Sequence, residues 1–314
     1  MPVIDVQHLT KRFGKKAAIE DLSFQVEPGE IVGLLGPNGA GKTTTMRILA
    51  CFLPASGGSV TICGLDVLSD SLEVRRRLGY LPESLPVYPE LRVKEFLRFW
   101  ARLKSVPWRV RRARVAEAME RCGLQEVQNR LTGQLSRGYR QRLGLAACLI
   151  HEPEVLILDE PTLGLDPHQV RHVRSLIRSL AEKRTVLLST HILSEVELTC
   201  DRVLIMKAGR LVASDRTENL MRRRRGAVQV IVELEAPPEA VVQACREVLH
   251  VTEVAADAAD GWCRATLTCA DGTDIRADVF RLATGRGWVL RELRQERNTL
   301  EDVFVELTGE GTAG

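Results

Sequence analysis

A glycine-rich run at residues 36–43, GPNGAGKT, has residue types and spacing suited to phosphate. It matches G-x-x-x-x-G-K-[ST] at every fixed position, directly after an apolar segment and before a helical one. Its glycines allow backbone N–H groups and the helix N-terminus to face an anion closely. We expect Lys42 to reach the β- and γ-phosphates of a nucleotide and the Thr43 hydroxyl to ligate Mg²⁺. The residues predicted to hold the nucleotide in this run are Gly36, Pro37, Asn38, Gly39, Ala40, Gly41, Lys42, Thr43 and Thr44.

Two adjacent carboxylates, Asp159 and Glu160, follow the apolar segment VLIL at residues 155–158. Ligands gather at the carboxyl edge of α/β sheets, and carboxylates at the end of a buried strand are costly to desolvate without cations or donors. We expect Asp159 to hold Mg²⁺ through water and Glu160 to be the base that polarises an attacking water. The alternative, a solvated strand end, leaves the accompanying phosphate-binding loop unexplained.

A serine and a histidine extend the candidate site. Ser136 precedes a helical segment that runs to about residue 150, and serine is a favoured N-cap. The segment LSRGY at 135–139 would by itself indicate only a capped helix, but it lies just upstream of VLILDE. His191 follows the strand-like segment TVLLST at 185–190 as Glu160 follows VLIL, so we expect both at one sheet edge, with His191 near a γ-phosphate.

Alternating strand and helix patterns must position these side chains. The apolar segments at 31–36, 155–158 and 185–190 are typical of buried strands in a parallel sheet. A helix is expected from about Lys42 to Leu53, ended by Pro54. The order predicts an α/β, P-loop domain over residues 1–221, with a mostly parallel sheet and a helical subdomain at about 84–150.

The pattern changes at RRRRG, residues 222–226, which we interpret as a solvated basic linker, with contact to anionic lipid as the alternative. Residues 227–314 predict the order β-α-β-β-α-β and then a last helix with a capping box at Thr299–Asp302. Apolar residues alternate along 228–234 and 263–269, and Ile275, Val279 and Leu282 form a helical stripe. A small α+β, ferredoxin-like accessory domain is therefore expected, with packing, dimer support or regulation as its role.

Composition excludes several classes of protein. The 314 residues are 45% hydrophobic and 27% charged with a net charge of +3, so neither nucleic acid nor a membrane surface is an expected partner from bulk charge. No apolar run approaches the ~18 residues of a membrane span, and no secretory signal is evident. Eight scattered cysteines predict reduced thiols in a cytosolic protein. A metal site at His168 and His172 is disfavoured because no further ligand accompanies them.

Residues 1 to about 220 resemble the ATP-binding-cassette (ABC) ATPases over the full length of that domain. GPNGAGKTT matches Walker A, VLILDE matches Walker B, LSRGY matches the signature and LGLD at 163–166 matches the D-loop. The resemblance implies that Phe13 stacks on adenine, that Asp166 crosses a dimer interface and that His191 is the switch histidine. It also implies that Ser136 and Gly138 of one subunit contact the γ-phosphate held by Lys42 of another. This ATP sandwich closes on binding and opens after hydrolysis.

Three residues depart from the family pattern. Arg137 and Tyr139 replace the first glycine and the glutamine of LSGGQ, while Ser136 and Gly138 are retained. Glu83 stands where the family has the Q-loop glutamine, and its carboxylate can still reach Mg²⁺. These changes, with the ending TLEDVFVELTG at 299–309, resemble the branch that drives ABC-2-type exporters.

The leading hypothesis is an ATPase subunit that dimerises, with itself or a near relative, beneath a separate ABC-2-type membrane permease and powers export. Such a protein is peripheral on the cytoplasmic face of the membrane. One alternative is a soluble mechanochemical ABC ATPase acting on ribosomes or nucleic acid, although the single cassette without a heptad run disfavours it. Another is an importer ATPase whose C-terminal domain senses a small molecule. A P-loop kinase is disfavoured by the signature segment.

Overall fold

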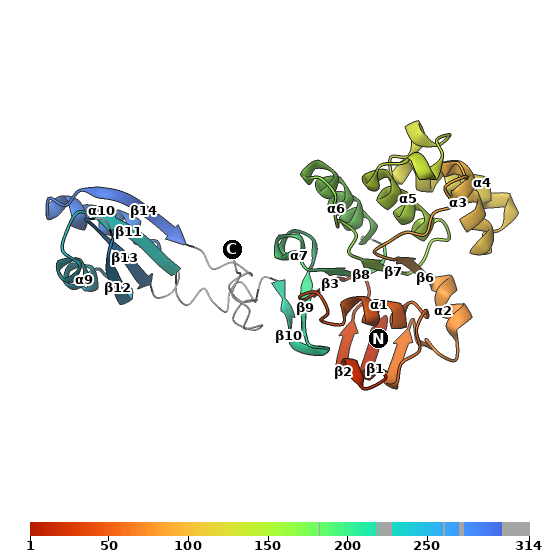
Figure 1. The fold of residues 1–314 in the computed structure, drawn as a ribbon, viewed down its shortest axis with the longest axis horizontal. Coiled ribbons are helices and arrows are strands. Elements are labelled where there is room, and N and C mark those ends of the chain that lie inside the picture. Colours follow the sequence, from red (N-terminus) through yellow and green to blue (C-terminus); the bar gives the residue numbers. More distant parts are fainter. Residues whose placement is uncertain (182, 218, 220–227, 260, 270–272, 297–314) are drawn as a thin grey trace. The chain divides into compact units, whose positions relative to one another are not determined.

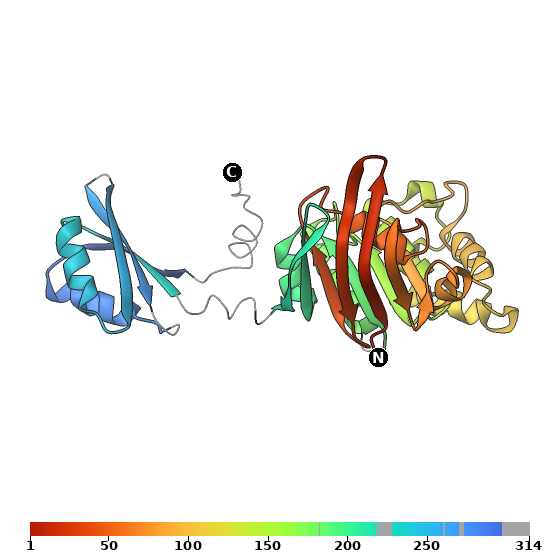
Figure 2. The ribbon, with the colours of Figure 1, turned by 90° about the horizontal axis from the view of Figure 1, so that it is seen from below.

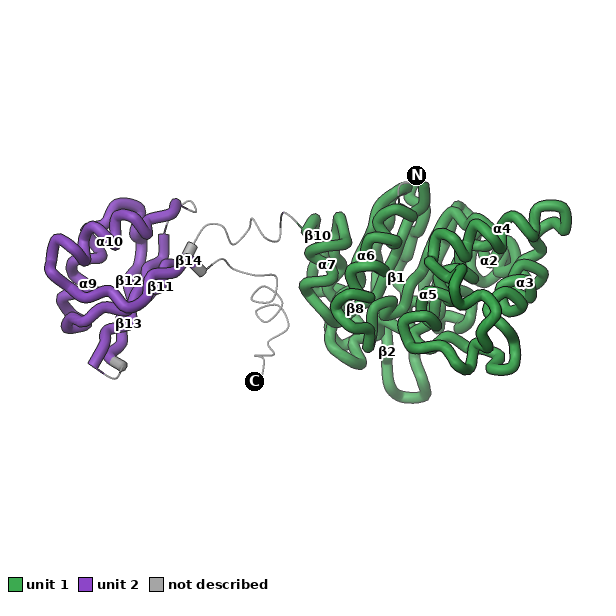
Figure 3. Tube along the Cα trace, turned by 90° about the horizontal axis from the view of Figure 1, so that it is seen from above, with its two compact units in different colours: residues 1–217 green, residues 218–314 purple. Residues whose placement is uncertain are grey.

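The computed structural model describes residues 1–181, 183–217, 219, 228–259, 261–269 and 273–296. The chain forms two compact units, residues 1–217 and 218–314 (Figure 3). This division falls just before the boundary expected at 221–222, and Thr217 is still bonded to the first unit. Its Oγ1 donates to the carbonyl of Cys200, and its N–H donates to the carbonyl of Asp201. The basic linker and the capping box at Thr299–Asp302 lie outside the described residues.

The first unit is built on a six-stranded sheet that carries the predicted parallel strands. Its members are β3 (Ile31–Leu35), β6 (Leu78–Leu81), β7 (Val155–Asp159), β8 (Thr185–Thr190), β9 (Arg202–Lys207) and β10 (Arg210–Arg216), in the order β10-β9-β3-β8-β7-β6. All neighbours are parallel except β9 and β10. Every residue of β3, β7 and β8 is buried, which explains their unbroken apolar sequences. Because these three strands are adjacent and parallel, their carboxyl ends meet at one edge.

A second sheet, antiparallel, covers the helix that follows the glycine-rich loop. It consists of β1 (Ile4–Phe13), β2 (Lys16–Val26), β4 (Gly57–Ile62) and β5 (Leu65–Asp66), in the order β2-β1-β4-β5. Figure 2 looks onto this sheet, with β1 and β2 side by side in red. The helix α1 (Lys42–Leu49) lies between the two sheets (Figure 1), in contact with β2 on one side and β7 and β8 on the other. Its Met46, Ile48 and Leu49 join both sheets in one core.

The opposite face of the six-stranded sheet is covered by α5 (Arg137–Leu149), α6 (Pro167–Ala181) and α7 (Leu193–Thr199) (Figure 1). Helix α5 contacts β6, helix α6 contacts β8, and helix α7 contacts both β3 and β8. The predicted helical region at 84–150 contains α5 with α3 (Val93–Leu103), α4 (Trp108–Arg121) and two single-turn helices, Gln125–Val127 and Thr132–Gln134. The short helix α2 (Ser71–Arg77) precedes β6.

The helix that follows the loop is shorter than expected. It ends at Leu49 rather than near Leu53, because the chain turns before it reaches Pro54. Cys51 adopts the left-handed conformation with φ 59°, and the N–H of Phe52 donates to the carbonyl of Arg47 at 2.8 Å. This is the hydrogen-bond pattern of a helix C-terminus closed by a left-handed residue. Such a cap is usually glycine, so the sequence gives little sign of it.

The second unit shows the predicted order β-α-β-β-α-β in its described residues. The elements are β11 (Val228–Leu234), α9 (Pro238–Arg246), β12 (Val251–Ala259), β13 (Trp262–Cys269), α10 (Arg276–Gly285) and β14 (Leu290–Glu296). The sheet order is β12-β13-β11-β14, with all neighbours antiparallel. From Val230 in β11 and from Cys263 in β13, every second residue is buried in the core shared with the helices, as the alternation predicts. These residues are Val230, Val232, Leu234, Cys263, Ala265, Leu267 and Cys269. Ile231, on the other face of β11, is 8% exposed.

Candidate functional site

A pocket of about 720 Å³ opens at the edge where β3, β7 and β8 end, within the size range of small-molecule sites. It is bounded by the glycine-rich loop, the turn between β1 and β2, and the turns after β7 and β8. The lining residues are Phe13, Lys16, Ala17, Ala18, Asn38, Gly39, Gly41, Lys42, Thr43, Thr44, Glu83, Glu160, Leu163, His191 and Ala208. The structure therefore brings together residues from six distant parts of the first unit.

The glycine-rich loop is confined by backbone on its inner side. A Cβ at Gly36 would lie 2.4 Å from the carbonyl oxygen of Met206, and one at Gly41 would lie 2.7 Å from that of Ala18. Gly41 also has φ 101°, a conformation that L side chains rarely adopt, and it immediately precedes α1. The loop therefore needs glycine at these positions in order to end at the N-terminus of α1, whose N–H groups attract anions.

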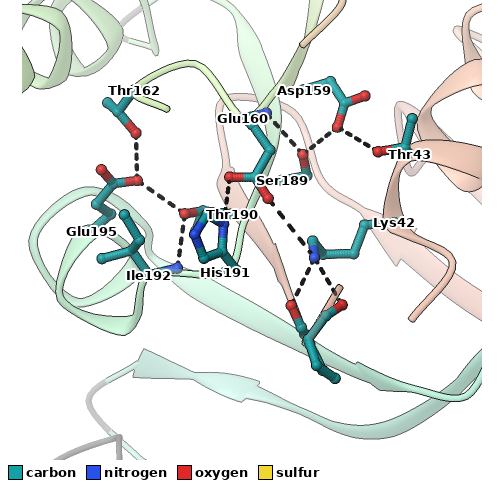
Figure 4. Close-up of polar contacts among 12 residues, drawn as sticks. Lys42, Thr43, Asp159, Glu160, Thr162, Ser189, Thr190, His191, Ile192 and Glu195 are labelled. Carbon is teal, nitrogen blue, oxygen red and sulfur yellow. Dashed lines mark hydrogen bonds and ion pairs between the residues drawn. The ribbon is translucent and has the colours of Figure 1, made fainter. Parts of the chain in front are cut away.

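Lys42 turns its ammonium group back over the loop. Its Nζ donates to the carbonyl of Gly36 at 2.7 Å and to that of Pro37 at 3.1 Å (Figure 4). It also lies 3.8 Å from Oε1 of Glu160. Burial lowers the pKa of Lys42, and the carboxylate of Glu160 opposes that shift. The cation is thus held at the inner end of the pocket, where a phosphate can replace the carbonyls.

Asp159 is fully buried and only half satisfied. Its Oδ1 accepts hydrogen bonds from Ser189 Oγ at 2.6 Å and Thr43 Oγ1 at 3.3 Å. Its Oδ2 is buried without a hydrogen-bond partner among the described residues. Burial raises the pKa of Asp159, and the hydrogen bond from Ser189 opposes this. A hydroxyl and a carboxylate with a free oxygen are ligands that Mg²⁺ prefers, so this pair fits that ion.

Glu160 stands at the point where β7 ends and the chain reverses. It has φ 49°, a strained conformation for a side chain of this size, and strain of this kind is often kept at functional sites. Its N–H donates to Ser189 Oγ at 3.0 Å. Its carboxylate accepts at Oε2 from His191 Nδ1 at 3.0 Å and faces Lys42 at Oε1 (Figure 4). Burial raises the pKa of Glu160, while the nearby His191 lowers it.

The predicted signature and D-loop residues do not line this pocket. Ser136 is the N-cap of α5, as expected, and its Oγ accepts from the N–H of Tyr139 at 3.4 Å. Gly138 packs against Gln169, so a Cβ there would lie 2.2 Å from Oε1 of that side chain. Asp166 caps α6, with Oδ1 accepting from the N–H groups of His168 at 3.0 Å and Gln169 at 2.9 Å. Ser136 and Asp166 are exposed, whereas Gly138 is buried.

Two predicted contacts lie at the rim of the pocket, and one partner of the buried carboxylates was not predicted. Phe13 is 52% exposed at the pocket, with Lys11 Nζ 5.1 Å from its ring centroid. Glu83 lines the pocket as well. The partner that was not predicted is Ser189, which bonds both Asp159 and Glu160. No local sequence pattern marks it, because its place depends on the register in which β8 pairs with β7, where Ser189 lies opposite Asp159.

The described residues contain neither a metal cluster of protein side chains nor a membrane-spanning helix. No group of three or more His, Cys, Asp or Glu side chains there is placed to hold a metal ion, and His168 and His172 are both exposed. No helix among the described residues is both long enough and apolar enough to span a bilayer.

Known proteins match this chain along most of its length. Residues 19–163 match the family described as "ABC transporter". The "Nod factor export ATP-binding protein I" of Burkholderia pseudomallei (strain 1710b) is 37% identical over 98% of this chain and 97% of its own. The "Linearmycin resistance ATP-binding protein LnrL" of Bacillus subtilis (strain 168) is 30% identical over 98% of both chains.

A solved structure agrees with the fold of the first unit. "Dimeric Structure of MJ0796, a Bacterial ABC Transporter Cassette" matches with TM-score 0.63 and 25% identity, covering 68% of this chain and 98% of that one. The first unit thus has a known ATPase fold, and it carries the glycine-rich loop, the two buried carboxylates and the capped helix α5. The chain aligns over 98% of its length with two ATP-binding subunits. The chain belongs to the ABC transporter family, in which it is the ATP-hydrolysing subunit of a membrane transporter.

Proposed function

We propose that the pocket at the ends of β3, β7 and β8 binds Mg-ATP and that Glu160 activates the water that attacks the γ-phosphate. The observation that carries this assignment is the position of the Glu160 carboxylate, buried between Lys42 and His191 at the pocket edge. Lys42 and the N–H groups of residues 36–44 would hold the phosphates, and Phe13 would stack on adenine.

Each group of the site has a distinct task. Glu160 takes the proton of the attacking water, and its pKa, raised by burial, favours that transfer. The contact with His191 orients the carboxylate and places the histidine beside the transferred phosphoryl group. Thr43 and Asp159 would hold Mg²⁺, with Glu83 as a further oxygen ligand from the rim. When bound, the ion neutralises phosphate charge.

The signature and D-loop residues support a dimer in which each subunit completes the site of the other. Ser136 at the N-terminus of α5 does not line the pocket of its own chain, and neither do Gly138 and Asp166. A second copy of this chain would present Ser136 and Gly138 to the γ-phosphate and Asp166 to the interface between the subunits. The dimeric ABC cassette of similar fold is consistent with this arrangement. ATP then favours the closed dimer and hydrolysis favours the open one.

The proposed partner is an ABC-2-type permease, and the proposed direction is export. Two relatives aligned over 98% of the chain are named for Nod factor export and for linearmycin resistance. The subunit would lie on the cytoplasmic face of the membrane, with its helical region and the loop around Glu83 against the permease. Residues 227–314 would be a ferredoxin-like accessory domain joined through the basic linker at 222–226.

Affinity purification from detergent-solubilised membranes tests the proposal. The Glu160→Gln variant keeps the shape of the side chain but cannot accept the proton, so it should retain ATP and keep the dimer closed. We expect one polytopic membrane protein to be recovered with Mg-ATP, and a hydrolysis rate lowered by about 10²–10⁴-fold. Recovery of ribosomes or nucleic acid without a membrane protein would instead favour the soluble mechanochemical class. The Lys42→Ala variant is the control, because it should not respond to ATP.

A further inference from the structure

A buried carboxylate behind the reacting groups has no task in the mechanism given above. Glu195 is the third residue of α7 and is only 6% exposed. One of its oxygens, Oε2, accepts two hydrogen bonds, from Thr162 Oγ1 at 2.6 Å and from Thr190 Oγ1 at 3.0 Å (Figure 4). A carboxylate is costly to bury unless donors meet it, so these hydroxyls stabilise its position.

The two threonines lie next to the reacting groups, Thr190 at the end of β8 and Thr162 in the turn after β7. Thr190 directly precedes His191, and its hydroxyl also accepts from the N–H of Ile192 at 3.0 Å, which folds the turn around it. Thr162 lies two residues after Glu160, and its carbonyl accepts from the N–H of Leu165 at 3.2 Å, on the way to the D-loop. Both hydroxyls are buried in the structure. A single oxygen atom therefore joins the turn after β7 to the turn after β8.

We propose that Glu195 is a positioning residue of ATP hydrolysis, whose carboxylate fixes the turn after Glu160 against the turn that carries His191. This inference rests on the proposed function, because it assigns Glu195 to the geometry of the Glu160–His191 pair. The 3.0 Å contact between His191 Nδ1 and Glu160 Oε2 spans two separate turns, and hydrogen bonds within either turn cannot fix it. The N–H of Glu160 already bonds Ser189 in front of them, and Glu195 supplies a second connection from behind.

A positioning role and a purely structural role give different kinetics. If Glu195 only stabilises α7, its loss lowers the amount of folded protein but leaves kcat of the folded protein unchanged. If it positions the pair, nucleotide still binds through the glycine-rich loop and Lys42, so the KM for ATP stays the same while kcat falls. Misplacement of a reacting group by about 1 Å can lower the rate by ~10²-fold.

Steady-state ATPase assays on the full chain with Mg-ATP test this, together with titration by a fluorescent ATP analogue. We expect Glu195→Ala to lower kcat by about 10–100-fold with KM and analogue affinity within about twofold of wild type. Glu195→Gln should recover most of the rate, because one amide oxygen can accept both hydroxyls. Thr162→Val should also lower kcat, and combining it with Glu195→Ala should add little, since both changes break the same connection.

The matched control is Thr217→Val, which removes another buried hydroxyl bond of the same unit, to the carbonyl of Cys200 at 3.0 Å. It should leave kcat unchanged. If Glu195→Ala binds the analogue and keeps wild-type kcat, the inference is wrong. If that variant does not bind the analogue, Thr162→Val decides by the same criterion. Glu160→Gln is assayed in parallel, and wild-type kcat in that variant would overturn the proposed function itself.

Discussion

Acidification should destabilise the first unit through one half-buried histidine, His151, in the segment between α5 and β7. Its Nε2 lies 3.0 Å from the carbonyl of Leu78, which can only accept, so Nε2 carries the proton. Its Nδ1 is buried without a hydrogen-bond partner among the described residues. Burial, assisted by the charge of Lys104, lowers the pKa of His151 to about 4. The folded protein therefore keeps this ring neutral at pH values where the unfolded chain protonates it.

The sign and size of the effect follow from this difference. Above the ordinary pKa of 6.5 the ring is neutral in both states and has no effect on stability. Below it, only the unfolded chain gains the proton, so stability falls as pH drops toward 4. At about 1.4 kcal/mol per pH unit, the loss between pH 6.5 and pH 5.0 is ~2 kcal/mol.

Urea denaturation at pH 7.5 and pH 5.0, followed by circular dichroism, measures this loss. The matched variant is His151→Gln, whose side-chain amide can still donate to the carbonyl of Leu78 but does not titrate in this range. The free energy of unfolding of the wild type should fall by about 2 kcal/mol more than that of the variant. All other titrating groups are shared, so their contributions cancel. An equal fall in both proteins would refute the reasoning.

Three further outcomes are expected. Asp159→Asn removes the charge opposite Thr43 and should raise the Mg²⁺ concentration for half-maximal ATPase by about 10–100-fold; an unchanged Mg²⁺ titration would argue against a metal role. Gly36→Ala places a Cβ 2.4 Å from the carbonyl of Met206, so the loop must shift and the Kd for the ATP analogue should rise at least ~10-fold. A Kd equal to that of the wild type would show that the loop accommodates the added Cβ without loss of binding. Leu267→Ala should destabilise the second unit by about 2–5 kcal/mol in urea without changing that Kd, since Leu267 belongs to a separate core; weaker analogue binding would contradict that separation.

The parts of the site that depend on local sequence could be predicted, because each carries its own signal. The loop before α1 needs glycines, and carboxylates directly after an unbroken apolar strand must lie at the sheet edge. Ser136 acts as the N-cap of α5, as its position before the helix indicates. The alternation along residues 230–234 and 263–269 likewise identified the buried face of the second unit.

The parts that depend on pairing between distant segments could not be predicted. Ser189 reaches Asp159 because β8 lies beside β7 in a particular register, which no local pattern reveals. The left-handed backbone of Glu160 results from the reversal of the chain at the pocket, not from its residue type. The early end of α1 at Leu49 has the same origin, since Cys51, a non-glycine residue just after the helix, adopts a left-handed conformation that the packing around it enforces.

The enclosure of α1 between two sheets has a consequence for hydrogen exchange. Most helices of a domain of this size have one face in water and open locally, whereas α1 is covered on both sides. Its amide hydrogens should therefore exchange only when one sheet separates, as slowly as those of β3 and β8. The nucleotide would bind at the N-terminal end of this helix, so ATP should stabilise both sheets together. At an ATP concentration of 100 times its Kd, the amide hydrogens of both sheets should exchange about 100-fold more slowly, which corresponds to ~2.7 kcal/mol of stabilisation.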